Sequence, residues 1–573
     1  MPRKLVLHQT MLPGMDDVEA SIKNLATSGI EERGAVFTKP AIVEFILDLA
    51  GYQAEHRLFE KRFLEPSFGH GSFLLPALRR LLSSWQQLGT SDPDSLKMSI
   101  WAIELHPDSY EKTRAAVLAL LNDFGLIRRV AVKLVDHWLV QGDFLLERIP
   151  GEFDFVVGNP PYVRIERIPQ TLMREYRARY KTIYDRADIY VPFIERSLDL
   201  LADGGKLGFI CADRWTKNRY GGPLRRKVAE GFHVESYVDM NCVDAFSSDV
   251  IAYPAITVIR NSNPGPTKIV SRASGDESSL KMLASKLSSG TKIQDEEVVT
   301  VEALSDGASP WIMTQCDSSK LLRHLEHDFP TIEQTGCKVG IGVATGADRV
   351  FIAPYDQLDV EEDRKLPLAT TKDIAGGQVE WQGLGVVNPF SDSGKLVELD
   401  RYPKLRNYLN ARREELCKRH VVKKAPANWY RTIDRIRADL AHTPKLLIPD
   451  IKGAANVVAE SGQLYPHHNL YFITAGEWDI EALKLVLSTG IAYLFVANYS
   501  TKMRGGYLRF QAQHLRRIRL PMWRTIAAPL QKELIEAGQA GAWEDGISLV
   551  SKLYDLTKPQ RLVLASHARE GVS

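Results

Sequence analysis

The sequence has few cysteines, no long hydrophobic run and almost no net charge, and each absence narrows the possible functions. The five cysteines are scattered, and none forms a Cys-x-x-Cys pair. This argues against a zinc site and a disulfide framework, and is typical of a reducing cytoplasm. No run of 18 apolar residues occurs and the first residues lack a signal-peptide pattern, so we expect neither membrane attachment nor secretion. We expect no metal.

Positive charge is concentrated in two segments, although the whole chain carries only +2. Residues 401–435 have a net charge of +8 and residues 501–519 of +6, so the rest of the chain carries −12. Basic clusters on an acidic background are typical of a protein that binds a polyanion, although two solvated helix faces would give the same composition. Because both clusters lie in the same half of the chain, nucleic acid is the favoured partner.

Strand-like and helix-like segments alternate between residues 30 and 260. Apolar strand-like stretches occur at 62–66, 99–103, 131–140, 153–157, 207–212 and 255–259, and helical spacing occurs at 42–49, 73–85 and 191–201. This alternation predicts an α/β domain with a doubly wound, mostly parallel sheet. From about residue 325 the pattern becomes mixed α and β with irregular loops, which predicts a second domain.

Acidic residues end three successive strand–helix units at a spacing of 39 residues: Glu65, Glu104 and Asp143. Ligands of open α/β sheets bind at this edge. Glu104 is placed for two ribose hydroxyls and Asp143 for an adenine amine, with Phe144 beside it to stack. The Gly69-x-Gly71 bend lacks the third glycine of a dinucleotide site, so the three acids predict a nucleoside site, although each alone could cap a helix.

The stretch Asn159-Pro160-Pro161-Tyr162 directly follows a short apolar run. Proline has no N–H and a fixed φ, so the chain must leave the strand as a stiff loop. The loop offers an amide and carbonyl oxygens that can accept hydrogen bonds from one amino group, and a ring that can stack on a base. This predicts a site for the exocyclic amine of a nucleobase; the alternative is a turn with a capping Asn.

In this order, the motifs resemble those of the gamma-class N6-adenine DNA methyltransferases, the TaqI and Eco57I kind. The matching parts are Gly34 to Pro40 with its Phe-Thr-x-Pro block, Glu65 to Leu74, Glu104, Gly142-Asp143-Phe144 and Asn159 to Tyr162. A looser resemblance extends through 346–351, 444–450 and 504–507. Phe68 departs from the pattern, because many relatives have a small residue there.

The resemblance implies S-adenosylmethionine as the methyl donor. It places Thr38 at the amino-acid end of this cofactor, Glu104 at the ribose and Asp143 at the adenine amine. It places Phe144 and Phe193 around the adenine ring. The remaining expected cofactor contacts are Glu65, Pro66, Ser67, Gly69, Gly71, Asn159 and Pro161.

The expected reaction is direct methyl transfer to adenine N6 in duplex DNA. Hydrogen bonds from the amine to Asn159 and to the Pro160 carbonyl would make its lone pair available. The base must be flipped out of the helix; Tyr162 would stack on one face and Phe246, or alternatively Tyr253, on the other. A core role for Phe246 stays open. No Pro-Cys nucleophile motif is needed for this reaction.

A basic segment directly after the Asn159 loop is expected to contact phosphates, although a solvated helix is the alternative. It comprises Arg164, Arg167, Arg174, Arg177, Arg179, Lys181 and Arg186. We refer to this segment as the basic flap.

The expected architecture is a Rossmann-like S-adenosylmethionine-dependent methyltransferase domain at 1–265, a linker or peripheral segment at 266–325, and an α+β target-recognition domain at 326–573. The chain would be the modification half of a type II restriction–modification system in the bacterial or archaeal cytoplasm, with any cognate endonuclease acting separately. A cytosine-N4 methyltransferase, and a DNA-binding protein with a vestigial methyltransferase fold, are the alternatives.

Overall fold

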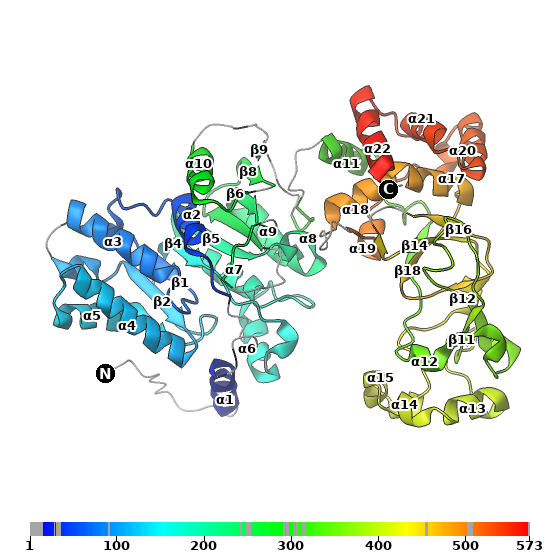
Figure 1. The fold of residues 1–573 in the computed structure, drawn as a ribbon, viewed down its shortest axis with the longest axis horizontal. Helices are drawn as coiled ribbons and strands as arrows, with labels where there is room; N and C mark the ends of the chain where they lie inside the picture. Colours follow the sequence, from blue (N-terminus) through cyan, green and yellow to red (C-terminus); the bar gives the residue numbers. More distant parts are fainter. Residues whose placement is uncertain are drawn as a thin grey trace. The chain divides into compact units, whose positions relative to one another are not determined.

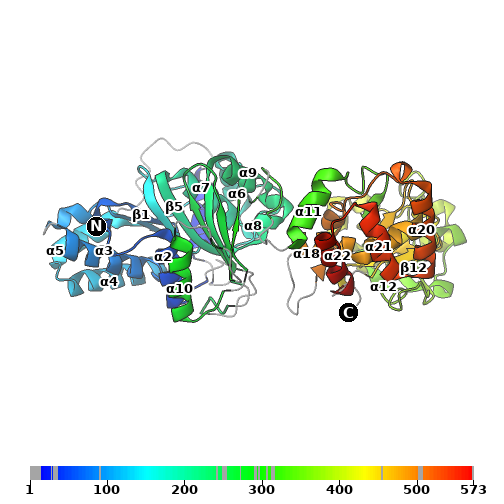
Figure 2. The same ribbon diagram turned by 90° about the horizontal axis from the view of Figure 1, so that it is seen from above.

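The computed structural model describes residues 15–570 apart from 28, 30–35, 90–91, 241–242, 248–253, 272, 290–292, 294–296, 303, 305–306, 312–316, 453–455 and 501–507. The chain divides into two compact units, Met1–Gln315 and Cys316–Ser573 (Figures 1 and 2). Each unit is described separately below.

The first unit is built on a nine-stranded sheet in the order β3-β2-β1-β4-β5-β7-β6-β8-β9. Strands β1 to β5 run parallel, whereas β7 is antiparallel to both β5 and β6. The strands are β1 (Phe63–Glu65), β2 (Ile100–Glu104), β3 (Leu139–Gln141), β4 (Phe153–Gly158), β5 (Leu201–Ala212), β6 (His233–Asp239), β7 (Pro254–Arg260), β8 (Thr267–Val270) and β9 (Val298–Val301).

Both faces of this sheet are covered by helices, which explains why its strands are apolar throughout. Successive residues of β1 point to opposite faces: Phe63 joins the core formed with α2, α3, α4, α5 and α10, and Leu64 joins the core formed with α6, α7 and α9. The helices are α1 (Met15–Ala26), α2 (Pro40–Ala50), α3 (Leu74–Leu88), α4 (Pro107–Asp123), α5 (Arg128–Trp138), α6 (Gln170–Arg179), α7 (Tyr190–Asp199), α8 (Arg214–Lys217), α9 (Gly222–Gly231) and α10 (Glu277–Ser288).

One segment differs from the sequence-based expectation, and a second forms regular structure at the sheet edge. Residues 131–140, expected to be a strand, lie mostly in α5, and only Leu139–Gln141 pair with β2. The buried residues Ala131, Leu134 and Val135 follow helical spacing, so the apolar run is one face of a helix. Residues 267–301 lie in the segment expected to be a linker or a peripheral segment; they add β8, α10 and β9 at the edge of the sheet, and both strands are rich in β-branched residues.

The second unit contains two four-stranded sheets and a two-stranded ribbon, β15-β19. The strand orders are β10-β18-β14-β16 and β11-β13-β12-β17. The strands are β10 (Lys338–Ile341), β11 (Ile352–Pro354), β12 (Lys365–Ala369), β13 (Leu384–Val387), β14 (Lys445–Pro449), β15 (Ile451–Lys452), β16 (Val458–Glu460), β17 (Tyr465–Pro466), β18 (Leu470–Thr474) and β19 (Leu508–Arg509).

Helices at the end of the chain pack against a buried apolar helix of this unit. The segment Ile480–Tyr499 is long and apolar enough to cross a membrane, with a mean hydropathy of 1.7, but 67% of it is buried, so burial accounts for its composition. The helices are α11 (Asp317–Asp328), α12 (Asp348–Phe351), α13 (Pro403–Asn410), α14 (Arg413–Cys417), α15 (His420–Lys424), α16 (Ala438–Ala441), α17 (Ile480–Val486), α18 (Ala492–Tyr499), α19 (Ala512–Leu515), α20 (Ala528–Ala540), α21 (Trp543–Leu553) and α22 (Lys558–Glu570).

Candidate cofactor and target-base site

Three neighbouring parallel strands bring the predicted site residues to one edge of the sheet. Strands β2, β1 and β4 are adjacent and end at Glu104, Glu65 and Gly158. Because parallel strands end at the same edge, Glu65, Glu104 and the loop that begins at Asn159 lie together. Pro160 and Pro161 then prevent β4 from continuing, because neither has an N–H to give to a neighbouring strand.

The side chain of Asn159 is oriented by the segment that precedes α2. Its Nδ2 donates hydrogen bonds to the Val36 carbonyl oxygen at 2.9 Å and to Thr38 Oγ1 at 3.2 Å. Its Oδ1 is buried and has no hydrogen-bond partner among the described residues. Because both amide hydrogens are directed to Val36 and Thr38, Asn159 presents a fixed acceptor to the site. A buried acceptor without a partner costs about 1–3 kcal/mol, and an incoming N–H donor would remove that cost.

Phe246 lies beside this loop, against the same segment. Residues 38 and 246 form an isolated antiparallel bridge, flanked by hydrogen bonds from Lys39 N to the Ala245 carbonyl and from Ser247 N to the Phe37 carbonyl. The ring of Phe246 is 6.1 Å from that of Tyr162, at an interplanar angle of 78°. The two rings therefore do not form parallel walls for a base in this arrangement. The alternative residue, Tyr253, lies outside the described residues.

Glu104 is held in place by two backbone N–H groups. Gly69 N donates to Oε2 at 2.7 Å and His106 N to Oε1 at 2.8 Å. These two hydrogen bonds fix the direction in which the Glu104 carboxylate points. The backbone beneath Glu104 is also fixed, because Thr113 Oγ1 donates to the Gly69 carbonyl at 2.8 Å. At Gly71, with φ +78°, a Cβ would lie 3.0 Å from the Thr113 methyl group, so glycine is required there.

Asp143 accepts a hydrogen bond that the sequence did not predict. Its Oδ1 accepts from Leu145 N at 2.8 Å, and its Oδ2 accepts from the Tyr176 hydroxyl at 2.5 Å. Burial raises the pKa of Asp143, and the Tyr176 hydrogen bond acts in the opposite direction. Tyr176 lies in α6, 33 residues away, within no recognisable motif, so only the tertiary structure identifies it.

Aromatic rings and a buried acid complete the pocket. Phe144 and Phe193 lie 4.9 Å apart between ring centroids, and the Arg196 guanidinium lies 5.0 Å from the centroid of Phe144. Glu65 is 1% exposed and its Oε2 has no hydrogen-bond partner among the described residues. Burial, and then the charge of Glu104, raise the pKa of Glu65 well above its usual range.

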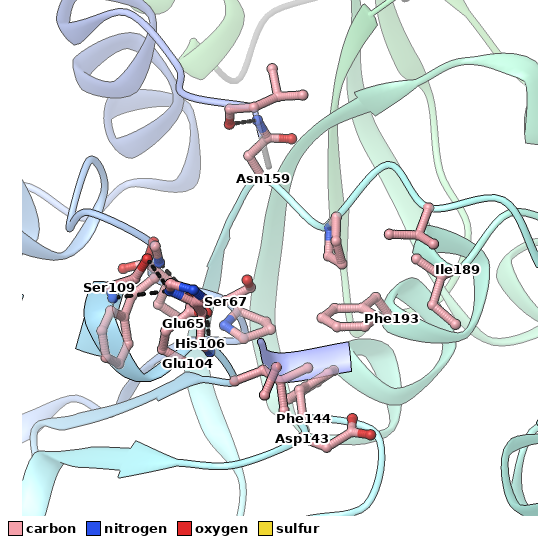
Figure 3. A pocket seen from close by; sticks show the side chains of 18 of the residues that line it. Glu65, Ser67, Glu104, His106, Ser109, Asp143, Phe144, Asn159, Ile189 and Phe193 are labelled. Carbon is pink, nitrogen blue, oxygen red and sulfur yellow. Dashed lines mark hydrogen bonds between the residues drawn. The ribbon is translucent and has the colours of Figure 1, made fainter. Parts of the chain in front are cut away.

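Figure 3 shows side chains that line one pocket: Glu65, Ser67 and Glu104 lie on one side, Phe193 and Ile189 on the opposite side, and Asn159 lies above them in this view. The predicted residues that line it are Thr38, Glu65, Pro66, Ser67, Gly69, Glu104, Asp143, Phe144, Asn159, Pro161 and Phe193. Gly71, Pro160, Tyr162 and Phe246 do not line it. The sequence missed the lining residues Leu25 and Ala26 of α1, His106, Ile168, Tyr176 and Ile189.

Acidic side chains within and outside the basic segments pair with several of their cations, so fewer of these cations are unpaired than the segment charges suggest. In the basic flap, Arg179 pairs with Glu175 at 2.8 Å. In 401–435, Arg401, Lys404, Arg406 and Lys418 pair with Glu398, Asp359, Asp400 and Glu414. In 501–519, Arg509, Arg516 and Arg517 pair with Asp450, Glu333 and Glu326. The motif at 504–507 lies outside the described residues.

Comparison with known proteins identifies the family. Residues 101–246 match the model of the Eco57I restriction-modification methylase. The type II methyltransferase M.PaeR7I of Pseudomonas aeruginosa is 55% identical over 566 residues, which cover 98% of this chain and 99% of that protein. The type II methyltransferase M.XhoI of Xanthomonas vasicola is 51% identical over 94% of this chain and 100% of that protein.

A solved structure shows the same fold at low sequence identity. It is the type IIL restriction-modification enzyme MmeI, solved in complex with DNA. The match covers 97% of this chain and 73% of the MmeI chain, with a TM-score of 0.55 and 12% sequence identity. At this identity the similarity concerns the fold alone. The two relatives M.PaeR7I and M.XhoI share more than half of the aligned residues with this chain and align over nearly the whole of both proteins. This chain therefore belongs to the type II methyltransferases of restriction–modification systems.

Proposed function

We propose that the protein transfers a methyl group to N6 of an adenine flipped out of duplex DNA. The observation that carries the proposal is the buried, unpartnered Oδ1 of Asn159, fixed as an acceptor by the hydrogen bonds that its Nδ2 donates to Val36 and Thr38. An exocyclic amine is the donor that this acceptor requires. Asn159 lies at the edge of the sheet where the nucleoside pocket also opens.

S-adenosylmethionine, the cofactor of this family, supplies an electrophilic methyl group on a sulfonium when bound. The pocket fits its parts. Glu104 lines the pocket as a carboxylate that can accept from the two ribose hydroxyls, and Phe144 offers a ring to the adenine. The unpartnered Oε2 of Glu65 suits the ammonium group. A positive charge beside Glu65 would also lower the raised pKa of that carboxyl group.

The protein contributes mainly positioning and electrostatics to the transfer. Hydrogen bonds from the target amine to Asn159 Oδ1 and the Pro160 carbonyl favour a pyramidal nitrogen, whose lone pair can form the new C–N bond as the C–S bond breaks. No covalent bond to the protein is needed. Cys211 lies close enough to Tyr162 to influence its ionisation, and burial raises the pKa of the Cys211 thiol far above its usual range, which disfavours a thiolate and hence methylation at a ring carbon.

Adenine is favoured over cytosine because residue 159 is Asn, whereas Ser is commoner at this position in cytosine-N4 enzymes. Incubation of the protein with S-adenosylmethionine and duplex DNA, followed by digestion to nucleosides and mass spectrometry, tests this directly. We expect N6-methyladenine. N4-methylcytosine would contradict the base assignment, and no methylated nucleoside would support the vestigial alternative.

Duplex DNA is the proposed partner, and the cytoplasm the proposed compartment. We assign methyl transfer to the first unit and target recognition to the second, which holds both basic segments. The Lys and Arg side chains that form ion pairs in the second unit can bind a DNA phosphate in place of the protein carboxylate. Such phosphate contacts position the protein on DNA but do not distinguish one base sequence from another. Any cognate endonuclease would act as a separate protein.

Replacing Tyr176 by Phe should weaken cofactor binding roughly ten-fold, since a hydrogen bond to a charged group contributes about 1.5 kcal/mol or more. It should also change the pH dependence. Burial raises the pKa of Asp143 and the Tyr176 hydrogen bond opposes that shift, so the variant should have a still higher Asp143 pKa. As pH falls, affinity should therefore be lost at a higher pH than in the wild type. Calorimetric titration at several pH values measures both effects.

Tyr180→Phe provides a matched control for this variant. Tyr180 directly follows α6 and is also buried, but its hydroxyl donates to the neutral Leu145 carbonyl at 2.6 Å. Its loss should leave the pH at which affinity declines unchanged. An identical pH profile in wild type and Tyr176→Phe would show that Tyr176 only fills space.

Replacing Phe246 by Ala should slow methyl transfer with little effect on cofactor affinity. Phe246 contacts the Asn159 side of the site but does not line the cofactor pocket. Loss of one base-stacking ring costs about 1–3 kcal/mol, or roughly 5- to 150-fold in rate. Phe246→Tyr should retain most activity, and single-turnover kinetics with 2-aminopurine at the target position would report the stacking directly. Reduced activity together with a lower unfolding temperature would indicate a core role instead.

A further inference from the structure

We propose that Asp348, His467 and His468 of the second unit form a binding site for one divalent transition-metal ion. We refer to these residues as the Asp–His–His cluster. Each offers one ligand atom, and the three atoms all lie within 4.8 Å of one another. They come from two segments 119 residues apart in the chain, so the fold alone brings them together.

The spacing of the first two ligands already suits a metal ion. His467 Nε2 lies 3.4 Å from Asp348 Oδ2. Donor atoms about 2.1 Å from a tetrahedral ion lie about 3.4 Å from one another. His468 is exposed, so rotation of its side chain can bring the third ligand atom to the same spacing. A site of two imidazoles and one carboxylate suits Zn²⁺, Co²⁺ or Ni²⁺ better than Mg²⁺ or Ca²⁺.

Asp348 is held in position by a second layer of contacts. Its Oδ1 pairs with Thr345 Oγ1 at 2.5 Å, and the same hydroxyl accepts from Ala347 N at 3.1 Å. Thr345 is fully buried. The sharp turn at Gly346, with φ +73°, lets the chain return so that Asp348 can reach that hydroxyl. Hydrogen-bonded outer partners of this kind orient the ligands of metal sites.

The two histidines are held by the backbone of the same turn. Val343 N donates to the Pro466 carbonyl at 2.9 Å, and His468 N donates to the Val343 carbonyl at 3.0 Å. His467 has an 11% exposed side chain, and its Nδ1 is buried without a hydrogen-bond partner among the described residues. Packing therefore sets the direction of this ring, with Nε2 facing Asp348.

The surroundings of the cluster carry charges of both signs and leave room for further ligands. The pocket beside the cluster is lined by the carboxylates of Asp348 and Glu415 and by Arg349, and the guanidinium of Arg419 donates to the Thr345 carbonyl at 3.2 Å. Three protein ligands leave at least one coordination position for water or another oxygen. A bound ion would cross-link the turn at 343–348 to the segment 466–468, and so would stabilise the second unit.

Titration of the untagged full-length protein with Zn²⁺ and with Co²⁺ tests the site. We expect one ion per chain, a visible Co²⁺ spectrum and a higher unfolding temperature that a chelator reverses. Asp348→Asn and His468→Gln should each weaken binding at least ten-fold. His420→Gln, an exposed histidine of the same unit outside the cluster, should bind like the wild type.

Absence of binding by the wild type, or equal affinity in His468→Gln, would overturn the proposal. His468 is exposed, so this variant tests the site without disturbing the core. Asp348→Asn and His468→Gln could instead retain Zn²⁺ affinity but change which DNA sequence is methylated. That result would also overturn the metal site and would identify the cluster as a reader of base edges.

Discussion

Asn159→Ala should abolish measurable methyl transfer while cofactor affinity stays within a few-fold of the wild type. The variant removes the fixed acceptor for the target amine, so the amine loses the interaction that frees its lone pair. Removal of one such positioned hydrogen-bonding group costs roughly 10²- to 10³-fold in rate. The loss should exceed this range, because the Asn159 side chain also ties the loop that it begins to Val36 and Thr38.

Transfer of a tritiated methyl group to duplex DNA measures the rate, and calorimetric titration with S-adenosylhomocysteine measures cofactor affinity. Asn122→Ala, an exposed position on α4 in the same unit, controls for nonspecific effects. Equal activity of Asn159→Ala and wild type would refute the proposed mechanism. Loss of cofactor binding in parallel with activity would show instead that Asn159 builds the pocket.

Lys445→Met should lower the unfolding temperature of the second unit by roughly 6–20 °C, equivalent to about 3–5 kcal/mol. Lys445 and Glu460 form an ion pair whose side chains are 0% and 1% exposed. Glu460 Oε1 also accepts hydrogen bonds from the backbone N–H groups of residues 462, 463 and 464. Burial lowers the pKa of Lys445, and the Glu460 carboxylate acts in the opposite direction. The substitution would leave the Glu460 carboxylate buried without its counter-ion.

Differential scanning calorimetry can compare this variant with two others. Lys418→Met breaks an exposed pair between Lys418 and Glu414, whose side chains are 73% and 89% exposed, and should barely change the unfolding temperature because water screens such a pair. The double variant Lys445→Met with Glu460→Gln removes both charges but keeps an oxygen for the backbone N–H groups, so it should recover much of the lost stability. A similar small loss in both single Lys variants would show that the buried pair is not a stability determinant.

The motifs and their order could be identified from the sequence, because each motif is formed by a few residues that are neighbours in the chain. The two prolines after Asn159 end β4 whatever position this strand takes in the sheet. The apolar alternation predicted the α/β sheet, and the comparisons confirm the methyltransferase family. Where one apolar run fits both a strand and a helix, as in residues 131–140, the sequence alone was ambiguous and the expectation was wrong.

Contacts between distant segments could be decided only by the tertiary structure. Nothing in the sequence indicates that Thr38 anchors the Asn159 amide, that Tyr176 donates to Asp143, or that Asp348 faces His467. The sequence therefore determined which chemical groups are available, namely an amide acceptor and a set of acids at strand ends. It also determined the enzyme family. Packing decided which lone pairs are already used and which remain for a ligand, because hydrogen-bond partners depend on distance in space and not along the chain.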